Sequence, residues 1–217
     1  MRIFIDYNST DQPYGGGNSF MKAFQQYCEE KGVTLAGSIN DKYDILFFNA
    51  AAKGPNEPHD LTELFQQKYY GKSGFLKKFI RGRTPKKLIY RVDGFRAYYA
   101  DMGRNRGDCL QRCCCQLADH VIFQSELSLE MAQSPKVGFG RTNYSVVHNG
   151  VDQGLFELND SEPWDGDRKL RVFSASWSKN PNKGFGALAD FSEFEEVEVS
   201  FCGRWPKEQI DPKNVTV

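Results

Sequence analysis

Short apolar runs alternate along this chain with segments in which apolar residues recur at helical spacing. The short runs predict strands at 2–7, 33–39, 44–49, 88–92, 121–124 and 144–147. The helical spacing predicts helices around 20–27, 109–118 and 127–132. Because strand and helix alternate, the pattern predicts an α/β fold with a doubly wound, Rossmann-like parallel sheet.

A second, smaller domain is predicted after an acidic stretch that contains proline and glycine. We interpret 157–169 as an exposed linker between an N-terminal domain, 1–156, and a C-terminal domain, 170–217. The latter carries predicted strands at 171–175 and 197–201, the opening of another at 214–217, and a helix with Leu188, Phe191 and Phe194 on one face. A single βαβ unit cannot cover both faces of a parallel sheet, so we expect this domain to be incomplete or to depend on a neighbour.

Composition excludes few partners. The 217 residues carry a formal net charge of zero, so bulk charge gives no indication of nucleic-acid binding. The apolar residues at 1–7 are too few for a signal sequence or a membrane span. Together with six cysteines, this favours a cytoplasmic protein in a reducing compartment.

Four of the cysteines, Cys109, Cys113, Cys114 and Cys115, resemble a metal cluster at first sight. Adjacent cysteines on a helix point in different directions, however, and no second pair lies nearby. The three histidines also lack metal-ligand spacing. We therefore interpret these cysteines as structural thiols and predict no metal site.

Two loops that precede predicted helices are candidates for phosphate binding. Lys183 is followed by Gly184 where a helix begins just after a buried strand, and free backbone N–H groups and a positive dipole end converge at such a place. The run Gly15, Gly16 and Gly17 lies between the first strand and the first helix. Missing side chains there would let a ligand approach the backbone, although a plain flexible turn explains the run equally well.

Polar residues also follow two other strands. Asp93 ends the strand that contains Arg91, and Asn149 and Gly150 follow the strand at 144–147. Open α/β sheets bind ligands at the carboxyl ends of their strands. Arg91 and Asp93 could nevertheless form a structural pair, and Asn-Gly is also common turn chemistry.

The segment 66–91 contains nine lysines and arginines, no acidic residue and several aromatic residues. Such a segment could contact an anionic membrane surface peripherally or bind an anionic acceptor. A solvated basic face is the simpler interpretation.

Five motifs in order carry a family resemblance: GGGNSF, YRVDGF, ADHVIFQSELS, VVHNGVDQGLF and SWSKNPNKGF. Together they resemble the group 1 (family 4) glycosyltransferases of the GT-B fold. The resemblance extends along the whole chain, which corresponds to the first half to two thirds of the family's usual length. It implies an N-terminal acceptor-side domain and the first βαβ unit of a second Rossmann-like, donor-binding domain.

The resemblance also implies an activity and roles for residues. Such enzymes move a sugar from a nucleotide-sugar donor to a carbohydrate or lipid-linked acceptor with retention of configuration, and they use neither a bound metal nor another cofactor. Lys183, Gly16 and Gly17 would contact the donor diphosphate. Asp93 would be the catalytic residue, and Arg91, Asn149 and Gly150 would line the acceptor side of the cleft.

Two departures from the family pattern change the expectation. Ser176 and Trp177 stand where many relatives have an arginine that contacts phosphate. The family's later motif of two glutamates would fall beyond Val217, so it cannot be assigned here. We therefore expect this short chain to be inactive by itself. Two alternatives remain: a noncatalytic remnant or binding module that associates with a partner, and a Rossmann oxidoreductase, which the glycine spacing disfavours.

Overall fold

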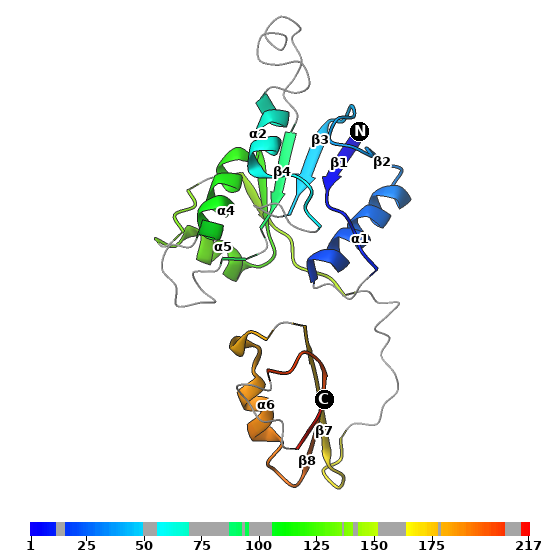
Figure 1. The fold of residues 1–217 in the computed structure, drawn as a ribbon, viewed down its shortest axis with the longest axis vertical. Helices are drawn as coiled ribbons and strands as arrows, with labels where there is room; N and C mark the ends of the chain where they lie inside the picture. The colour runs from blue at the N-terminus through cyan, green and yellow to red at the C-terminus, as the bar shows by residue number, and fades with distance from the viewer. Residues whose placement is uncertain are drawn as a thin grey trace, which may run out of the picture. The chain divides into compact units, whose positions relative to one another are not determined.

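The structure, a computed structural model, describes most of the chain in two compact units. The described residues are 1–11, 16–49, 56–69, 87–92, 94–95, 106–135, 137–140, 143–151, 164–177, 179–206 and 214–217. Unit 1 comprises Met1–Gly150 and unit 2 comprises Val151–Val217 (Figure 1). Most of the predicted linker lies outside the described residues, so its bounds remain a prediction.

Unit 1 contains a six-stranded sheet in which every pair of neighbouring strands is parallel. Its order is β2-β1-β3-β4-β5-β6. The strands are β1 (Arg2–Asp6), β2 (Thr34–Leu35), β3 (Ile45–Phe48), β4 (Lys87–Arg91), β5 (His120–Phe123) and β6 (Tyr144–Val146). The predicted α/β class and parallel sheet are confirmed, and the architecture is consistent with a Rossmann-like fold.

Helices cover both faces of this sheet (Figure 1). They are α1 (Gly16–Glu30), α2 (Leu61–Tyr69), α4 (Arg106–Leu117) and α5 (Glu126–Gln133). Buried residues of α1 pack with one set of strand side chains, and those of α2, α4 and α5 pack with the other set. The sheet is therefore the middle of three layers.

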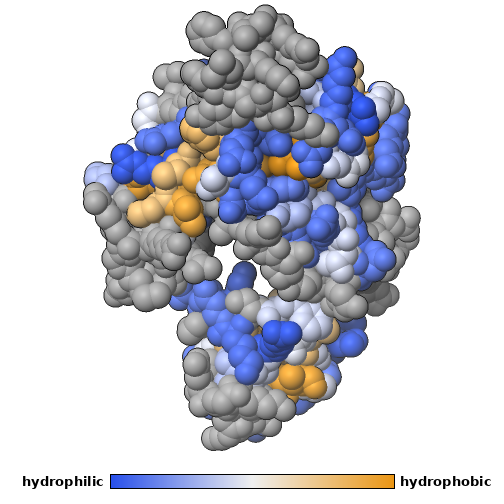
Figure 2. Space-filling view, turned by 45° about the horizontal axis from the view of Figure 1, so that its top comes forward, coloured by the Kyte–Doolittle hydropathy of each residue, from blue (hydrophilic) through white to orange (hydrophobic). Residues whose placement is uncertain are grey.

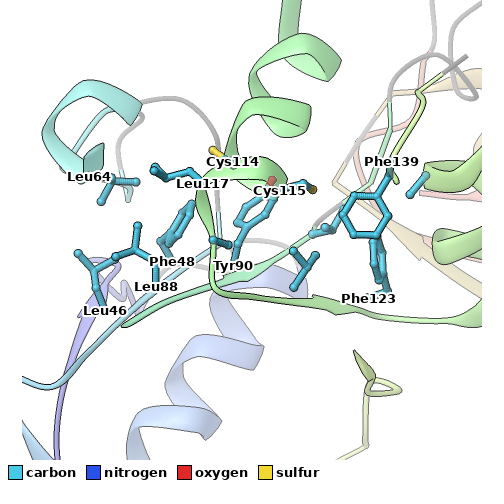
Figure 3. Packing of buried hydrophobic residues seen from close by; sticks show 14 of the residues in the cluster. Leu46, Phe48, Leu64, Leu88, Tyr90, Cys114, Cys115, Leu117, Phe123 and Phe139 are labelled. Carbon is cyan, nitrogen blue, oxygen red and sulfur yellow. The ribbon is translucent and has the colours of Figure 1, made fainter. Parts of the chain in front are cut away.

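The alternation of side chains along β3 explains how both faces become buried. Leu46 and Phe48 join the core on the side of α2 and α4, whereas Ile45 and Phe47 join the core on the side of α1. Figure 3 shows the first of these cores, where strand side chains meet residues of the helices. A strand buried on both faces must be apolar throughout, and for this reason β3 reads as a continuous apolar run.

Two elements of unit 1 differ from the prediction. Helix α2 was not predicted, because Leu64 is its only fully buried apolar residue among the described side chains. Its start is stabilised by a reciprocal cap, in which the backbone N–H of Glu63 donates to Asp60 and that of Asp60 donates to Glu63. Strand β2 is shorter than predicted: only Thr34–Leu35 pairs with β1.

Unit 2 contains a three-stranded parallel sheet of order β7-β8-β9. The elements are β7 (Leu170–Ser176), the 3-10 turn η3 (Pro181–Lys183), α6 (Phe185–Phe191), β8 (Val197–Gly203) and β9 (Val215–Thr216). The predicted βαβ unit and the strand near the end of the chain are thus present.

The predicted apolar face of α6 is wrong. Phe185 is fully buried, and Leu188 and Ala189 pack against the same core, whereas Phe191 and Phe194 are 48% and 58% exposed. Phe194 also follows the end of the helix. The helix begins directly after Gly184, as predicted, but its buried stripe lies nearer its start than the predicted face.

Only one face of the unit 2 sheet is covered by α6. Val199 and Phe201 of β8 are buried beneath the helix, but Phe173 of β7 points to the other face and is 71% exposed. Parallel sheets are normally covered on both faces. The expectation that this domain is incomplete or depends on a neighbour stays a prediction.

Strands β7 and β8 approach each other closely where they end. Gly203 has φ 121°, and a Cβ atom there would lie 2.2 Å from the carbonyl oxygen of Ser176. That carbonyl accepts a hydrogen bond from the backbone N–H of Arg204 at 2.8 Å. Only glycine fits both the backbone angle and the space.

One face of the described surface is largely polar. Figure 2 shows one face, on which hydrophilic residues predominate and apolar residues form small separate patches. Among the described residues, no helix combines the length and the apolar content that crossing a bilayer requires.

We predict that Leu88→Ala destabilises unit 1 far more than Leu127→Ala. Leu88 is fully buried in the sheet, whereas Leu127 is 59% exposed on α5. The buried substitution should lower the free energy of unfolding by about 2–5 kcal/mol. The exposed one should change it by no more than about 0.5 kcal/mol in urea denaturation. Equal effects would contradict the assignment of this core.

Candidate functional site

The carboxyl edge of the unit 1 sheet is the place where this topology favours a ligand site. Strand β1 has β2 on one side and β3 on the other, so the chain changes direction across the sheet at β1. In open parallel sheets ligands bind beyond the carboxyl ends of the strands at such a switch point. The start of α1, at Gly16, belongs to the connection that follows β1.

A buried arginine lies at this edge. Arg91, the last residue of β4, is only 2% exposed. Its Nη1 donates to Oδ1 of Asn49 at 2.6 Å, and its Nη2 donates to Oδ1 of Asn149 at 2.8 Å. Its guanidinium carbon lies 3.9 Å from the centre of the Phe20 ring on α1, which is a cation–π contact.

The two asparagines extend this network. Nδ2 of Asn149 donates to Oε1 of Gln124 at 2.8 Å, and Nε2 of Gln124 donates to the carbonyl of Val92, also at 2.8 Å. On the other side, a Cβ atom at Gly17 would lie 3.6 Å from Nδ2 of Asn49. Hydrogen bonds and close packing therefore join the ends of four strands and the first turn of α1.

The structure brings several of the predicted site residues together. Arg91 and Asn149, which are 58 positions apart, bond directly, and Gly17 lies beside Asn49, the other partner of Arg91. We call Gly17, Asn49, Arg91, Gln124 and Asn149 the edge cluster. It contains residues from four of the five motifs that carry the family resemblance.

Two predicted residues, Gly16 and Gly150, are chain neighbours of edge-cluster residues but are not part of the edge cluster. Gly16 is the exposed first residue of α1, with open space around it. Gly150 is exposed beside Asn149 and does not have a positive φ. No turn forms at Asn149 and Gly150, so the alternative interpretation of this pair as a plain turn is wrong.

Asp93 and Gly15 lie outside the described residues. The proposed pairing of Arg91 with Asp93 and the catalytic role of Asp93 therefore stay predictions. Arg91 instead has the two amide oxygens among its partners.

A second polar pair lies at the end of β1. Oδ1 of Asp6 is 2.6 Å from Nδ1 of His59, and Asp6 is only 2% exposed. Burial raises the pKa of the nearby Tyr43 hydroxyl, and the charge of Asp6 raises it further. The pair fixes the imidazole so that Nε2 points away from the carboxylate, as in sites where histidine transfers protons.

This Asp6–His59 pair is separated from the edge cluster by the sheet. Asp6 and Phe4 are two positions apart on β1, so their side chains lie on the same face of the sheet, the α2 side. The ring of Phe4 meets that of His59 edge-on, with 6.0 Å between the ring centres. Arg91 lies against Phe20 on the α1 side. The two groups therefore face opposite layers of unit 1.

In unit 2, Lys183 ends the turn η3 and is exposed. Its backbone N–H donates to the carbonyl of Asn180 at 3.0 Å. Gly184 follows with φ 79°, a left-handed conformation that favours glycine, and α6 begins at the next residue. The left-handed backbone at Gly184 is thus a structural reason for glycine at this position. Lys183 is an exposed lysine directly before it.

The basic segment is only partly described, since 70–86 lie outside the described residues. Two of its basic residues are internal. Lys68 is 9% exposed and its Nζ lies 3.3 Å from Oδ2 of Asp119, while Arg91 is 2% exposed. Neither belongs to a solvated basic face or to a surface that could contact a membrane.

The interpretation of the cysteines as structural thiols holds for part of the group. Cys114 and Cys115 are buried in the core of unit 1, as Figure 3 shows, but Cys109 and Cys113 are exposed. Within the described parts of the chain, no group of three or more histidine, cysteine or acidic residues is placed to hold a metal ion.

Sequence reasoning missed Asn49, Gln124, Phe20 and the Asp6–His59 pair. One signal was available, since Asn49 and Gln124 each come directly after a short apolar strand. Polar residues at this position face the ligand edge of a parallel sheet. The pairing of His59 with Asp6 had no such signal, because 53 positions separate the two residues.

Comparison with protein-family models and with curated proteins gives no match to this chain. The fold and the edge cluster define an α/β protein with a Rossmann-like parallel sheet and a polar, hydrogen-bonded group at the carboxyl edge of that sheet.

We predict that Arg91→Lys destabilises unit 1, whereas Arg112→Lys does not. Lysine cannot donate in two fixed directions while stacking on Phe20, so at least one of the two asparagine oxygens loses its partner. The expected loss is about 1–3 kcal/mol in the free energy of unfolding. Arg112, an exposed residue of α4, is the matched control. Urea denaturation measures both variants, and equal stabilities would contradict the role of the network.

Proposed function

We propose that this chain is a retaining glycosyltransferase of the GT-B type, which moves a sugar from a nucleotide-sugar donor to a carbohydrate or lipid-linked acceptor. The observation that carries the proposal is the edge cluster. GGGNSF, YRVDGF and VVHNGVDQGLF are far apart in the sequence, yet each contributes residues to one hydrogen-bonded and packed group at the ligand edge of the sheet. Motifs that share a function should meet in this way.

The glycines support a ligand at this edge. A Cβ atom at Gly16 would meet nothing within 4 Å, and one at Gly17 would make an ordinary contact with Asn49. Neither residue has a positive φ. The fold therefore does not require glycine at either position. If glycine is needed there, the reason would be a ligand that approaches the backbone at the start of α1.

Arg91 acts in this proposal as a positioning residue. Both of its Nη atoms already donate to asparagine oxygens, and the side chain is buried. It holds Asn49 and Asn149 in place, and Asn149 and the neighbouring Gly150 are the exposed groups that would meet an acceptor. Asp93 remains the proposed catalytic residue on the basis of the family resemblance.

Lys183 is the proposed phosphate contact of the donor side. Negative charge accumulates on the nucleoside diphosphate as the bond to the sugar breaks. A fixed ammonium group therefore stabilises the transition state more than the ground state. The exposed position of Lys183 directly before Gly184 and α6 makes its side chain available for this role.

We predict that Lys183→Ala weakens the binding of a nucleoside diphosphate. Titration calorimetry with UDP, GDP and ADP should identify one that binds. Loss of a charged hydrogen bond should then cost about 1.5–3 kcal/mol. This is roughly a ten- to hundredfold loss of affinity.

Lys169→Ala is the matched control, because Lys169 is an exposed lysine of the same unit that precedes β7. It should bind like the unchanged chain. Failure of all three nucleotides to bind, or equal weakening in both variants, would argue against a donor site at Lys183.

We also predict that Gly16→Ala and Gly17→Ala weaken binding of the sugar nucleotide without harming the fold. Alanine is the better helix former, so the free energy of unfolding should stay the same or rise by up to about 1 kcal/mol. Gly140→Ala is the control, since Gly140 is an exposed loop residue of unit 1 with open space around it. Unchanged nucleotide affinity in all three variants would remove the glycines from the site.

A further inference from the structure

Helix α4 divides its cysteines between the core and the surface. Cys114 and Cys115 are 0% and 1% exposed, whereas Cys109 and Cys113 are exposed free thiols. Cys109 and Cys113 are four positions apart, so they lie on the same side of the helix, one turn apart.

This spacing suits one atom bound between two sulfurs. Residues at i and i+4 have Cβ atoms about 5–6 Å apart. A thiolate binds a soft metal such as zinc at about 2.3 Å, so two Sγ atoms can approach one shared atom from adjacent turns. A disulfide needs Cβ atoms about 3.5–4.5 Å apart, which a regular helix does not provide at this spacing.

The surroundings favour a centre that needs only two sulfur ligands from the protein, rather than a structural zinc ion. Structural zinc requires four protein ligands, and in the described parts of the chain no third histidine, cysteine or acidic residue joins the pair. Both thiols are exposed, so a ligand can reach them without opening the core.

We propose that Cys109 and Cys113 form a dithiol site for a soft, thiophilic centre that accepts two sulfur ligands, with trivalent arsenic as the chemical type. In the reaction with an arylarsine oxide, two S–H bonds and the As–O bonds break. Two As–S bonds form, and the oxygen leaves with both protons as one water molecule. Arsenic stays trivalent, so no oxidant or reductant is needed.

The other cysteines provide internal controls. Burial raises the pKa of the Cys114 thiol and of the Cys28 thiol, so both remain protonated and poorly reactive. Cys202 is exposed, but it is the single cysteine of unit 2 and cannot chelate by itself.

The test uses phenylarsine oxide with the reduced chain and detection by native mass spectrometry. We expect one adduct per chain that gains C6H5As and loses two hydrogens, resists excess 2-mercaptoethanol and is removed by dithiothreitol. Cys109→Ser and Cys113→Ser should each weaken capture by about a hundredfold or more, because the second bond of a chelate forms at high effective concentration. Cys202→Ser should bind like the unchanged chain.

Circular dichroism checks that each serine variant is folded. Absence of the adduct in the unchanged folded chain would overturn the proposal, and so would an adduct that persists in Cys113→Ser. The outcome is independent of nucleotide binding, because Cys109 and Cys113 do not belong to the edge cluster or to the loop of Lys183.

Discussion

The arrangement of unit 1 at the carboxyl edge of its sheet depends on a buried guanidinium group. Burying a cation in a protein interior is unfavourable unless hydrogen bonds and neighbouring dipoles replace the lost water. For Arg91, two amide oxygens and the face of an aromatic ring are part of that replacement. Because the fork of donors is planar and rigid, it fixes both asparagines relative to the strand.

This constraint connects the packing of the sheet to its chemistry. Arg91 ends β4, Asn49 follows the neighbouring strand β3, and Asn149 comes shortly after β6, which does not pair with β4. One side chain therefore links the ends of two paired strands to a segment that the backbone ladder does not join to them directly. The sheet also separates this group from the Asp6–His59 pair on the opposite layer. The carboxyl edge of the sheet thus carries two polar groups, the edge cluster on the α1 side and the Asp6–His59 pair on the α2 side.

The strands were predictable because burial on both faces requires continuous apolar runs, as in β3 and β5. Helix α2 was not, since Leu64 is its only fully buried apolar residue among the described side chains and a capping pair at Asp60 and Glu63 stabilises its start. The face of α6 was misplaced because exposed Phe191 and Phe194 have the same spacing as core residues. Apolar spacing shows that a stripe exists, but tertiary packing decides where the stripe lies.

The site was predictable only as far as local position reveals it. Arg91 and Asn149 could be chosen because each follows or ends a strand, but their bond spans 58 positions and arises from the order of the strands. The same limit applies to the cysteines of α4. Their spacing distinguishes faces of a helix, but it does not say which face is turned to the core.

Gly203 shows that a position without any side chain can still control where a neighbouring loop departs from its strand. Its missing side chain lets β8 approach the carbonyl of Ser176, the residue from which the segment leading to Lys183 departs. Any larger residue would displace that departure point. In the evolution of such a chain, selection on the course of this loop would therefore also preserve a glycine in the neighbouring strand.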